Sequence, residues 1–469
     1  MNDRPRAPDP AMARAIALAR NAAWLVLWCG SAACRRGPAA AASVPGDDAA
    51  AAAAPAADAS GREGAPVIAG RCKPSGPVVS FADSAGGAVE IGDAVALDDG
   101  AVAVGAVRDG PGGRAAVIAW MASENAAPEF VRLGNALGDA PPPLLARCGG
   151  EVIAAAFEAP VAGARGPSLD GRRSLGLWSV LPGGAKVVGA VEQQRDDSLA
   201  FDVACAGPGG RSRLVVWDET VGAPGSTPRG VIRAAAPGHE GPPAHDVSPA
   251  SSDAELPRVV RRGAAGFYVV WLAHRPEPGA GDASLEFEAP AEARAYGWLE
   301  MVGADLAGNP VTPVQRLTPP TGHVSAYDLL AAGDDARPRL IVVARDEGES
   351  SERADGSGGV LLRVRADEDR AEPASPLPSD GLGRGAPALA PGPGGAWLAW
   401  VGPREAPRLL PLDGTGAPAG PISGEDALDD ARPLLSTAAG PDPASRAARM
   451  LVAIATERGA ELRAFTCTR

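Results

Sequence analysis

The sequence predicts an all-β fold, and three observations support that class. One passage recurs along most of the 469 residues: an apolar stretch passes through a Gly-rich turn into a β-branched run that ends in an aromatic residue. The composition includes 60 glycines and 47 prolines, which suit many short strands joined by tight turns. No long stretch after residue 76 has a convincing helical period.

The recurring passage is clearest at residues 143–157, 257–271 and 387–400. A hairpin that cannot bury its own apolar face must stack on copies of itself. The copies follow one another at roughly 50 to 70 residues, a spacing typical of propeller blades. The second strands of these copies end near Val107, Phe157, Trp217, Trp271, Ala344, Trp400 and Ala455.

A third strand and a polar turn follow in most copies. The fourth copy has Ala295 to Val302 and then Asp305-Leu306-Ala307-Gly308-Asn309, and the sixth has Arg408 to Leu412 and then Asp413-Gly414-Thr415-Gly416. Four short antiparallel strands per copy, repeated radially, make a β-propeller. The sequence therefore predicts a single seven-bladed β-propeller over residues 76–469, closed by its N- and C-terminal strands. A pair of β-sandwiches is the alternative, which fits the strand content but not the even recurrence.

The residues before the repeats predict export and a tether. Residues 1–33 read as a signal peptide that can also start at Met12, with basic Arg14 and Arg20, an apolar run over 22–28 and small residues before Cys34. That run is shorter than the about 20 residues of a spanning helix. Residues 34–75 are rich in Ala, Pro and Gly, which predicts a disordered tether.

The segment Ser31-Ala32-Ala33-Cys34 resembles the lipobox of bacterial lipoproteins, with serine where that family usually carries leucine. The resemblance implies that Cys34 becomes the lipidated first residue; release of a soluble protein by an ordinary signal peptidase is the alternative. With its tether and degenerate repeats, the chain resembles exported bacterial β-propeller repeat lipoproteins, without the signature of a specific propeller subfamily. The resemblance implies a periplasmic or cell-surface location.

Four cysteines remain for disulfides in the exported part: Cys72, Cys148, Cys205 and Cys467. The last copy lacks a fourth strand, and residues 78–81 have no copy of their own. If this N-terminal stretch completes the last blade, Cys72 lies beside Cys467 and a disulfide closes the ring. Cys148 and Cys205 then pair by elimination, provided that their Cα atoms lie within about 7 Å.

No catalytic or metal site emerges from the polar residues. His239, Glu240, His245 and Asp246 cluster between the third and fourth copies, but their spacing matches no metal-ligand pattern, which predicts a solvated loop. Aspartates such as Asp98, Asp99, Asp334 and Asp335 stand at expected turns. Of the three tyrosines, Tyr327 alone opens an inner strand where a channel-facing catalyst could lie.

Other candidates favour structural roles. Trp217, Trp271 and Trp400 occupy matched positions, which indicates packing between blades rather than a sugar site. The pairs Arg172-Arg173 and Arg261-Arg262 are expected on solvated faces. Long polar connections are candidates for function, and they span 222–256, 275–293 and 347–358.

The charge of −13, with Lys73 and Lys186 as the only lysines, argues against a nucleic-acid partner. The sequence shows no cofactor-binding motif. We therefore expect a monomeric, non-catalytic cell-envelope module that binds or scaffolds an envelope protein or glycan and touches the membrane through its lipid anchor only. The alternative is a secreted carbohydrate-active hydrolase, which would need two carboxylates ~5–10 Å apart in one pocket.

Overall fold

The computed structural model describes residues 71–468, with gaps at 75–78, 82–88, 98, 111–112, 124–125, 137–139, 159–172, 194–198, 223–228, 238–243, 277–294, 349–358, 384, 393–394, 403–406, 425–435, 442–446 and 457–458. These residues belong to one compact unit, Pro66–Arg469. The signal peptide, Cys34 and most of the predicted tether lie outside them. Within the described part, the one helical segment is the short 3-10 turn Pro208–Gly210, and no helix has the length and hydropathy to cross a membrane.

The strands form seven antiparallel sheets, numbered here in chain order. Sheet 1 comprises β3 (Val89–Ala96), β4 (Val102–Gly110), β5 (Gly113–Met121) and β6 (Glu129–Asn135). Sheet 2 comprises β7 (Leu144–Cys148), β8 (Glu151–Glu158), β9 (Arg173–Leu181) and β10 (Gly184–Gln193). Sheet 3 comprises β11 (Phe201–Ala206), β12 (Ser212–Val221), β13 (Arg229–Ala235) and β14 (His245–Asp246).

The later sheets repeat the same strand order. Sheet 4 comprises β15 (Asp253–Arg262), β16 (Gly266–Pro276), β17 (Ala295–Ala304) and β18 (Gln315–Arg316). Sheet 5 comprises β19 (Val324–Asp334), β20 (Arg337–Asp346), β21 (Val360–Ala366) and β22 (Ser375–Pro376). Sheet 6 comprises β23 (Ala388–Gly392), β24 (Gly395–Val401), β25 (Pro407–Asp413) and β26 (Ser423–Gly424). Sheet 7 comprises β27 (Ser436–Pro441), β28 (Ala447–Thr456) and β29 (Gly459–Thr468), together with β1 (Arg71–Pro74) and β2 (Val79–Ser80).

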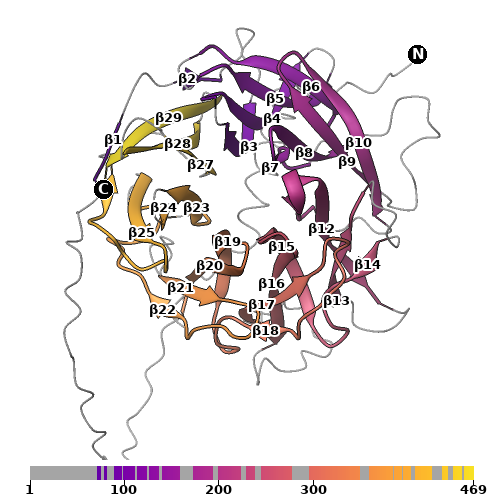
Figure 1. The fold of residues 1–469 in the computed structure, drawn as a ribbon, viewed down its shortest axis with the longest axis vertical. Coiled ribbons are helices and arrows are strands. Elements are labelled where there is room, and N and C mark those ends of the chain that lie inside the picture. Colours follow the sequence, from indigo (N-terminus) through magenta and orange to yellow (C-terminus); the bar gives the residue numbers. More distant parts are fainter. Residues whose placement is uncertain are drawn as a thin grey trace, which may run out of the picture. The chain divides into compact units, whose positions relative to one another are not determined.

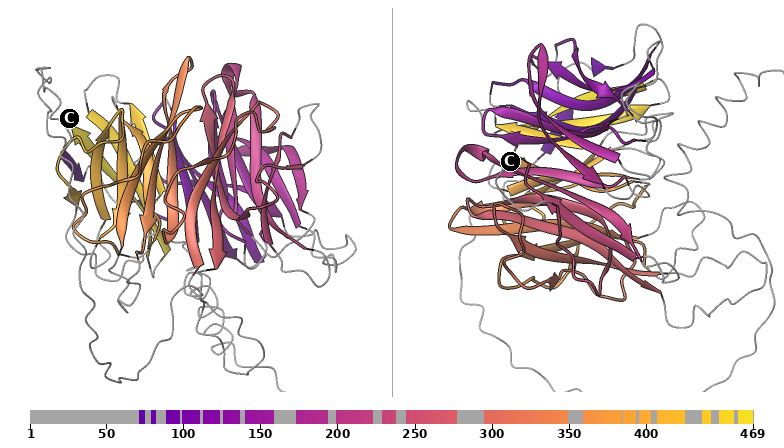
Figure 2. Two further views of the ribbon diagram at one scale, coloured as in Figure 1. Left: turned by 90° about the horizontal axis from the view of Figure 1, so that it is seen from below. Right: turned by 90° about the vertical axis from the view of Figure 1, so that its right-hand side faces the viewer.

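The first strand of each sheet contacts the first strand of the next, and β27 contacts β3. Figure 1 shows the sheets around a common centre with these first strands innermost, and Figure 2 shows the strands running along the viewing direction of Figure 1. Each predicted second strand is the second strand of one sheet. This is a propeller-like arrangement of four-stranded sheets, and not two stacked sandwiches.

The core lies between neighbouring sheets. Along β16, Phe267, Val269 and Trp271 pack toward sheet 3, whereas Tyr268 and Val270 pack toward sheet 5. Successive side chains of a strand point to opposite faces, so a strand between two neighbours is apolar throughout. This explains why the second strands read as unbroken β-branched and aromatic runs.

The N-terminal stretch pairs with the last strand of the chain. β2 pairs with β29 at Leu462 and Glu461, and Phe81 is 1% exposed in a cluster that includes Leu462. β1 pairs with the end of β29, in a register that places Cys72 opposite Cys467. This is the strand pairing that the sequence predicts for residues 78–81. Pairing begins at Arg71, within the segment assigned to the tether.

A disulfide joins Cys148 of β7 to Cys205 of β11, with Cα atoms 5.3 Å apart. The separation falls within the range that a disulfide spans. The bond links the inner strands of sheets 2 and 3, as predicted by elimination from the sequence.

The turns between third and fourth strands dock on the preceding sheet. Asp305 begins the turn of sheet 4, where His245 Nε2 lies 2.9 Å from the Gly308 carbonyl oxygen. The turn of sheet 5 contains Glu368, whose carbonyl accepts from the side-chain amide of Gln315 in sheet 4 at 2.6 Å. The turn of sheet 6 contains Thr415, whose carbonyl accepts from Arg363 in sheet 5 at 3.1 Å. One repeated device therefore fastens sheets 3 to 6 in series.

Candidate functional site

Charged side chains gather on the inner strands of the described sheets. Asp93 lies on β3, Asp202 on β11, Arg258 on β15, and Tyr327 and Asp328 on β19. We call these five residues the inner-strand cluster. The three aspartates and Arg258 are partly exposed, whereas Tyr327 is 4% exposed.

Each aspartate of the cluster joins its own strand to the inner strand of the next sheet. The main-chain N–H of Leu145 donates to Asp93 Oδ2 at 3.3 Å, that of Val259 to Asp202 Oδ2 at 2.8 Å, and that of Leu389 to Asp328 Oδ2 at 2.6 Å. The second oxygen of Asp93 accepts from Ala94 at 2.7 Å, and that of Asp202 accepts from Val203 at 2.8 Å. Sheets 1 and 2, 3 and 4, and 5 and 6 are joined in this way.

The charges of the cluster act on one another. Burial raises the pKa of Asp202 to about 6, although the Arg258 cation and two main-chain N–H groups act in the opposite direction. Burial likewise raises the pKa of Asp328 to about 6 against the same cation. Burial alone would lower the pKa of Arg258, but the carboxylates of Asp202 and Asp328 outweigh it and raise that pKa. The site thus holds one fixed positive charge among three acids.

Tyr327 does not present its hydroxyl to a ligand at this site. Its Oη lies 2.5 Å from the carbonyl oxygen of Leu256 and 2.9 Å from that of Val270, both in sheet 4. Burial raises the pKa of Tyr327 well above its ordinary value. The sequence placed Tyr327 on an inner strand, which is confirmed, but the hydroxyl serves the joint between sheets 4 and 5.

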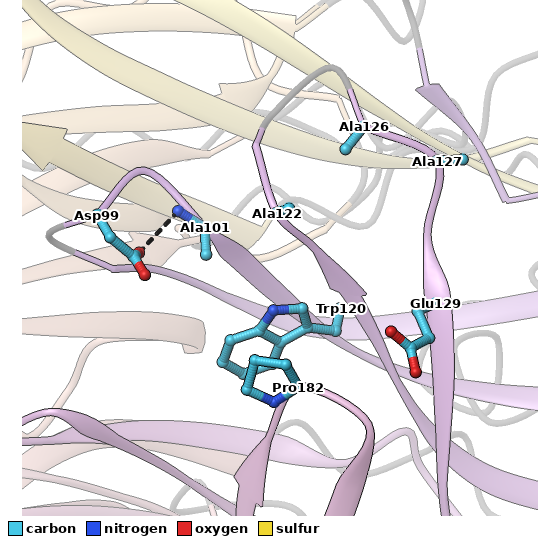
Figure 3. Close-up of a pocket in the computed structure, with 8 residues that line it drawn as sticks. All are labelled: Asp99, Ala101, Trp120, Ala122, Ala126, Ala127, Glu129 and Pro182. Carbon is cyan, nitrogen blue, oxygen red and sulfur yellow. Dashed lines mark hydrogen bonds between the residues drawn. The ribbon is translucent and has the colours of Figure 1, made fainter.

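A pocket of about 280 Å³ lies between sheets 1 and 2. Trp120, Pro182 and four alanines line it, with the carboxylates of Asp99 and Glu129 on opposite sides of the indole (Figure 3). Asp99 Oδ1 accepts the main-chain N–H of Ala101 at 3.0 Å, which is the turn role expected for this residue. Apolar walls beside two carboxylates suit a small group that carries a positive charge on an apolar body.

His245 and Asp246 do not lie in the solvated loop that the sequence suggested for the histidine segment. His245 and Asp246 form β14, the fourth strand of sheet 3, and Asp246 pairs with Arg233 at 3.3 Å. His239 and Glu240 lie outside the described residues. Similarly, the stretch 222–256 contains β13 and β14, and the expectation of one long connection there was wrong.

The three matched tryptophans are buried between sheets, as predicted. Trp217 and Trp271 are 0% exposed and Trp400 is 2% exposed. The expectation of solvated arginines was wrong for Arg262, which is 6% exposed and pairs with Glu368 at 2.7 Å. Arg261 does lie on the surface and pairs with Asp335 at 2.9 Å. Arg172 and most of 275–293 and 347–358 lie outside the described residues.

Sequence reasoning missed the aspartates of the cluster. Each stands directly before an apolar run, as in Asp93-Ala94-Val95-Ala96, Asp202-Val203-Ala204-Cys205 and Asp328-Leu329-Leu330-Ala331. This pattern occurs in the first strands of sheets 1, 3 and 5 and was available in the sequence. The pattern was missed because an isolated aspartate is usually interpreted as a turn residue.

No protein-family model matches the chain, and no curated protein matches it. Among solved structures, it is similar to a protein of unknown function from Dyadobacter fermentans, with 11% identity, a TM-score of 0.44, and coverage of 86% of this chain and 99% of that one. It is also similar to Kuenenia stuttgartiensis hydrazine synthase (10% identity, TM-score 0.44, covering 79% and 94%). A third is the hemagglutinin-neuraminidase ectodomain of parainfluenza virus 5 (9% identity, TM-score 0.40, covering 69% and 80%). At these identities the likeness concerns the fold alone.

Proposed function

We propose that this chain is a non-catalytic binding or scaffolding module of a bacterial cell envelope, held on a lipid anchor at Cys34. Its body is a single seven-bladed β-propeller that closes where β1 and β2 meet β29. The strand pairing of β1 and β2 with β29 and the contact of β27 with β3 support this closure. The export signal and lipobox support the anchor, and the partner is an envelope protein or glycan.

The observation that carries this proposal is the use made of the inner-strand acids. Both oxygens of Asp93 and of Asp202 accept main-chain N–H groups, one from the same strand and one from the next sheet. Such carboxylates fix the positions of neighbouring sheets. A rigid ring with its acids engaged in this way suits a surface that binds.

Acylation and partner capture test the proposal together. The full chain is expressed in a bacterial host with an alkyne-bearing fatty acid, alongside the Cys34→Ala variant. We expect the label and the membrane association in the parent chain, and loss of both in the variant. Cross-linking in intact cells should then recover one envelope partner with the parent chain. Variants of the inner-strand cluster that still fold should recover the same partner. A soluble, unlabelled parent chain would contradict the anchor.

A hydrolase is the second candidate, because a pKa of about 6 at Asp202 and Asp328 is in the range that a general acid uses. The purified chain is assayed on a panel of glycosides beside Asp202→Asn and Asp328→Asn. Turnover by the parent chain that either substitution abolishes without unfolding the protein would establish the hydrolase and overturn the binding module.

A further inference from the structure

Two arginines lie within cation–π distance of aromatic rings at one edge of sheet 4. The guanidinium carbon of Arg275 lies 5.4 Å from the ring centroid of Tyr296 and 5.8 Å from that of Trp298. The guanidinium carbon of Arg316 lies 5.9 Å from the same Trp298 ring. We call these four residues the arginine–aromatic patch. Both arginines are exposed.

The register of the sheet explains why these side chains meet. Arg275 of β16 lies opposite Tyr296 of β17, and Arg316 of β18 lies opposite Glu300 of β17. Tyr296, Trp298 and Glu300 alternate along one strand and therefore share a face. Trp298 packs on that face in the core between sheets 3 and 4.

The aromatic platform is fixed in place. Trp298 is 8% exposed, and its indole N–H donates to the buried Glu300 Oε1 at 2.9 Å. The other oxygen of Glu300 accepts from Trp271 and from Ser252, each at 3.2 Å. Glu300 thus holds two indoles and a hydroxyl. The centroid of the Tyr296 ring also lies 5.5 Å from that of the His323 ring.

Several other arginines in the described part of the chain have carboxylate partners. Arg114, Arg262, Arg345 and Arg408 each pair with a carboxylate at 2.6 or 2.7 Å. No carboxylate among the described residues lies within ion-pair distance of Arg275 or Arg316. A guanidinium within about 6 Å of a ring centroid is attracted to the ring by a cation–π interaction, and its N–H donors can bind an oxyanion in pairs.

We propose that the arginine–aromatic patch binds an oxyanion, a phosphate or carboxylate group of an envelope ligand. Two cations on a fixed platform are a local exception in a chain of net charge −13. Their N–H donors supply the recognition, and the cation–π contacts keep the two guanidinium groups near the rings. The inference concerns the surface of sheet 4 and goes beyond the proposed function. It stands whether or not Cys34 is acylated, so the two can fail separately.

Calorimetric titration of the full exported chain tests the patch. The probes are pyrophosphate and a galacturonic acid trimer, which separate phosphate from sugar carboxylate, with a neutral galactose trimer as control. We expect one acidic probe to bind and the neutral one not to bind. The double variant Arg275→Gln/Arg316→Gln should weaken binding by about tenfold or more, because it removes both charged forks. Added salt should weaken the parent complex.

Arg261→Gln is the matched control, because Arg261 is exposed on sheet 4 but already paired with Asp335. Its affinity should equal that of the parent chain, and thermal unfolding should show that all variants remain folded. Unchanged affinity in the double variant would overturn the proposal. So would a parent chain that binds neither acidic probe. The sequence between β16 and β17 carries carboxylates of its own, and anion binding that appears only after these are changed to glutamine would assign the patch to an internal contact instead.

Discussion

At the scale of the residue, Asp202 and Asp328 are joints between sheets whose strength depends on pH. The pKa of Asp202 is raised from 3.8 to about 6, so the folded chain holds this proton more tightly than the unfolded chain does. Its contribution to stability is therefore complete below about pH 4 and is lost as the pH rises through about 6. Asp328 behaves in the same way.

Asp202→Asn should flatten the dependence of stability on pH. The amide cannot ionise and keeps one oxygen to accept a main-chain N–H. Urea unfolding at about pH 4.5 and about pH 7 should show that the free energy of unfolding falls less in the variant than in the parent chain, by up to roughly 2 kcal/mol. An equal loss in both proteins would contradict the burial of this charge.

Asp305 provides the control of opposite sign. Burial alone would raise its pKa, but hydrogen bonds from Asn309, Ala307 and Gly308 lower it. Its contribution is present above about pH 4 and is lost only in stronger acid. In the same urea unfolding experiment, Asp305→Asn should therefore lower the free energy of unfolding by the same amount at both pH values.

At the scale of the element, the sequence predicted the strands that are long enough to show an apolar pattern. The second strands of sheets 1 to 6 are buried on both faces, and unbroken apolar runs in the sequence identified the second strands of all seven sheets. The fourth strands β14, β18, β22 and β26 have two residues each, too short for any period. His245 and Asp246 were therefore assigned to a loop.

The inner-strand cluster was missed for a related reason. Asp93, Asp202 and Asp328 bond to main-chain groups of the next copy, 52, 57 and 61 residues away. A local pattern shows that an aspartate stands before an apolar run, but it does not show which strand its oxygens reach. The partners follow only from the order of the sheets in space.

The docking turns allow a prediction with an internal control. Gly308 has φ +89°, and an added Cβ would lie 2.6 Å from Leu214 Cδ1. Gly100 has φ +87°, with nothing within 4 Å of an added Cβ. Both alanine variants incur backbone strain of about 1–3 kcal/mol, but only Gly308→Ala also pushes the turn away from sheet 3. Thermal unfolding should show the larger loss for Gly308→Ala. Equal losses would mean that the docked turn contributes nothing.

At the scale of the whole molecule, the inner strands are linked joint by joint. Asp93 joins sheets 1 and 2, the Cys148–Cys205 disulfide joins 2 and 3, Asp202 joins 3 and 4, and Asp328 joins 5 and 6. Tyr327 joins 4 and 5. A serial arrangement of this kind still opens at the point where the two chain ends meet. That joint has the pairing of β1 and β2 with β29, and its strength decides whether the seven sheets unfold as one unit.

The Cys72–Cys467 disulfide that the sequence predicts would add a covalent link at that joint, where Cys72 lies opposite Cys467 in the register of β1 and β29. A cross-link stabilises mainly by restricting the unfolded chain, and more so for a longer loop. The 57-residue separation of Cys148 and Cys205 corresponds to about 4 kcal/mol in this account, and the loop from Cys72 to Cys467 to more. Cys72→Ser/Cys467→Ser should therefore lose more stability to urea than Cys148→Ser/Cys205→Ser. Peptide mapping of the exported protein without reductant should recover both linked pairs. Free thiols at Cys72 and Cys467 would show that strand pairing alone joins β1 to β29, without a covalent bond.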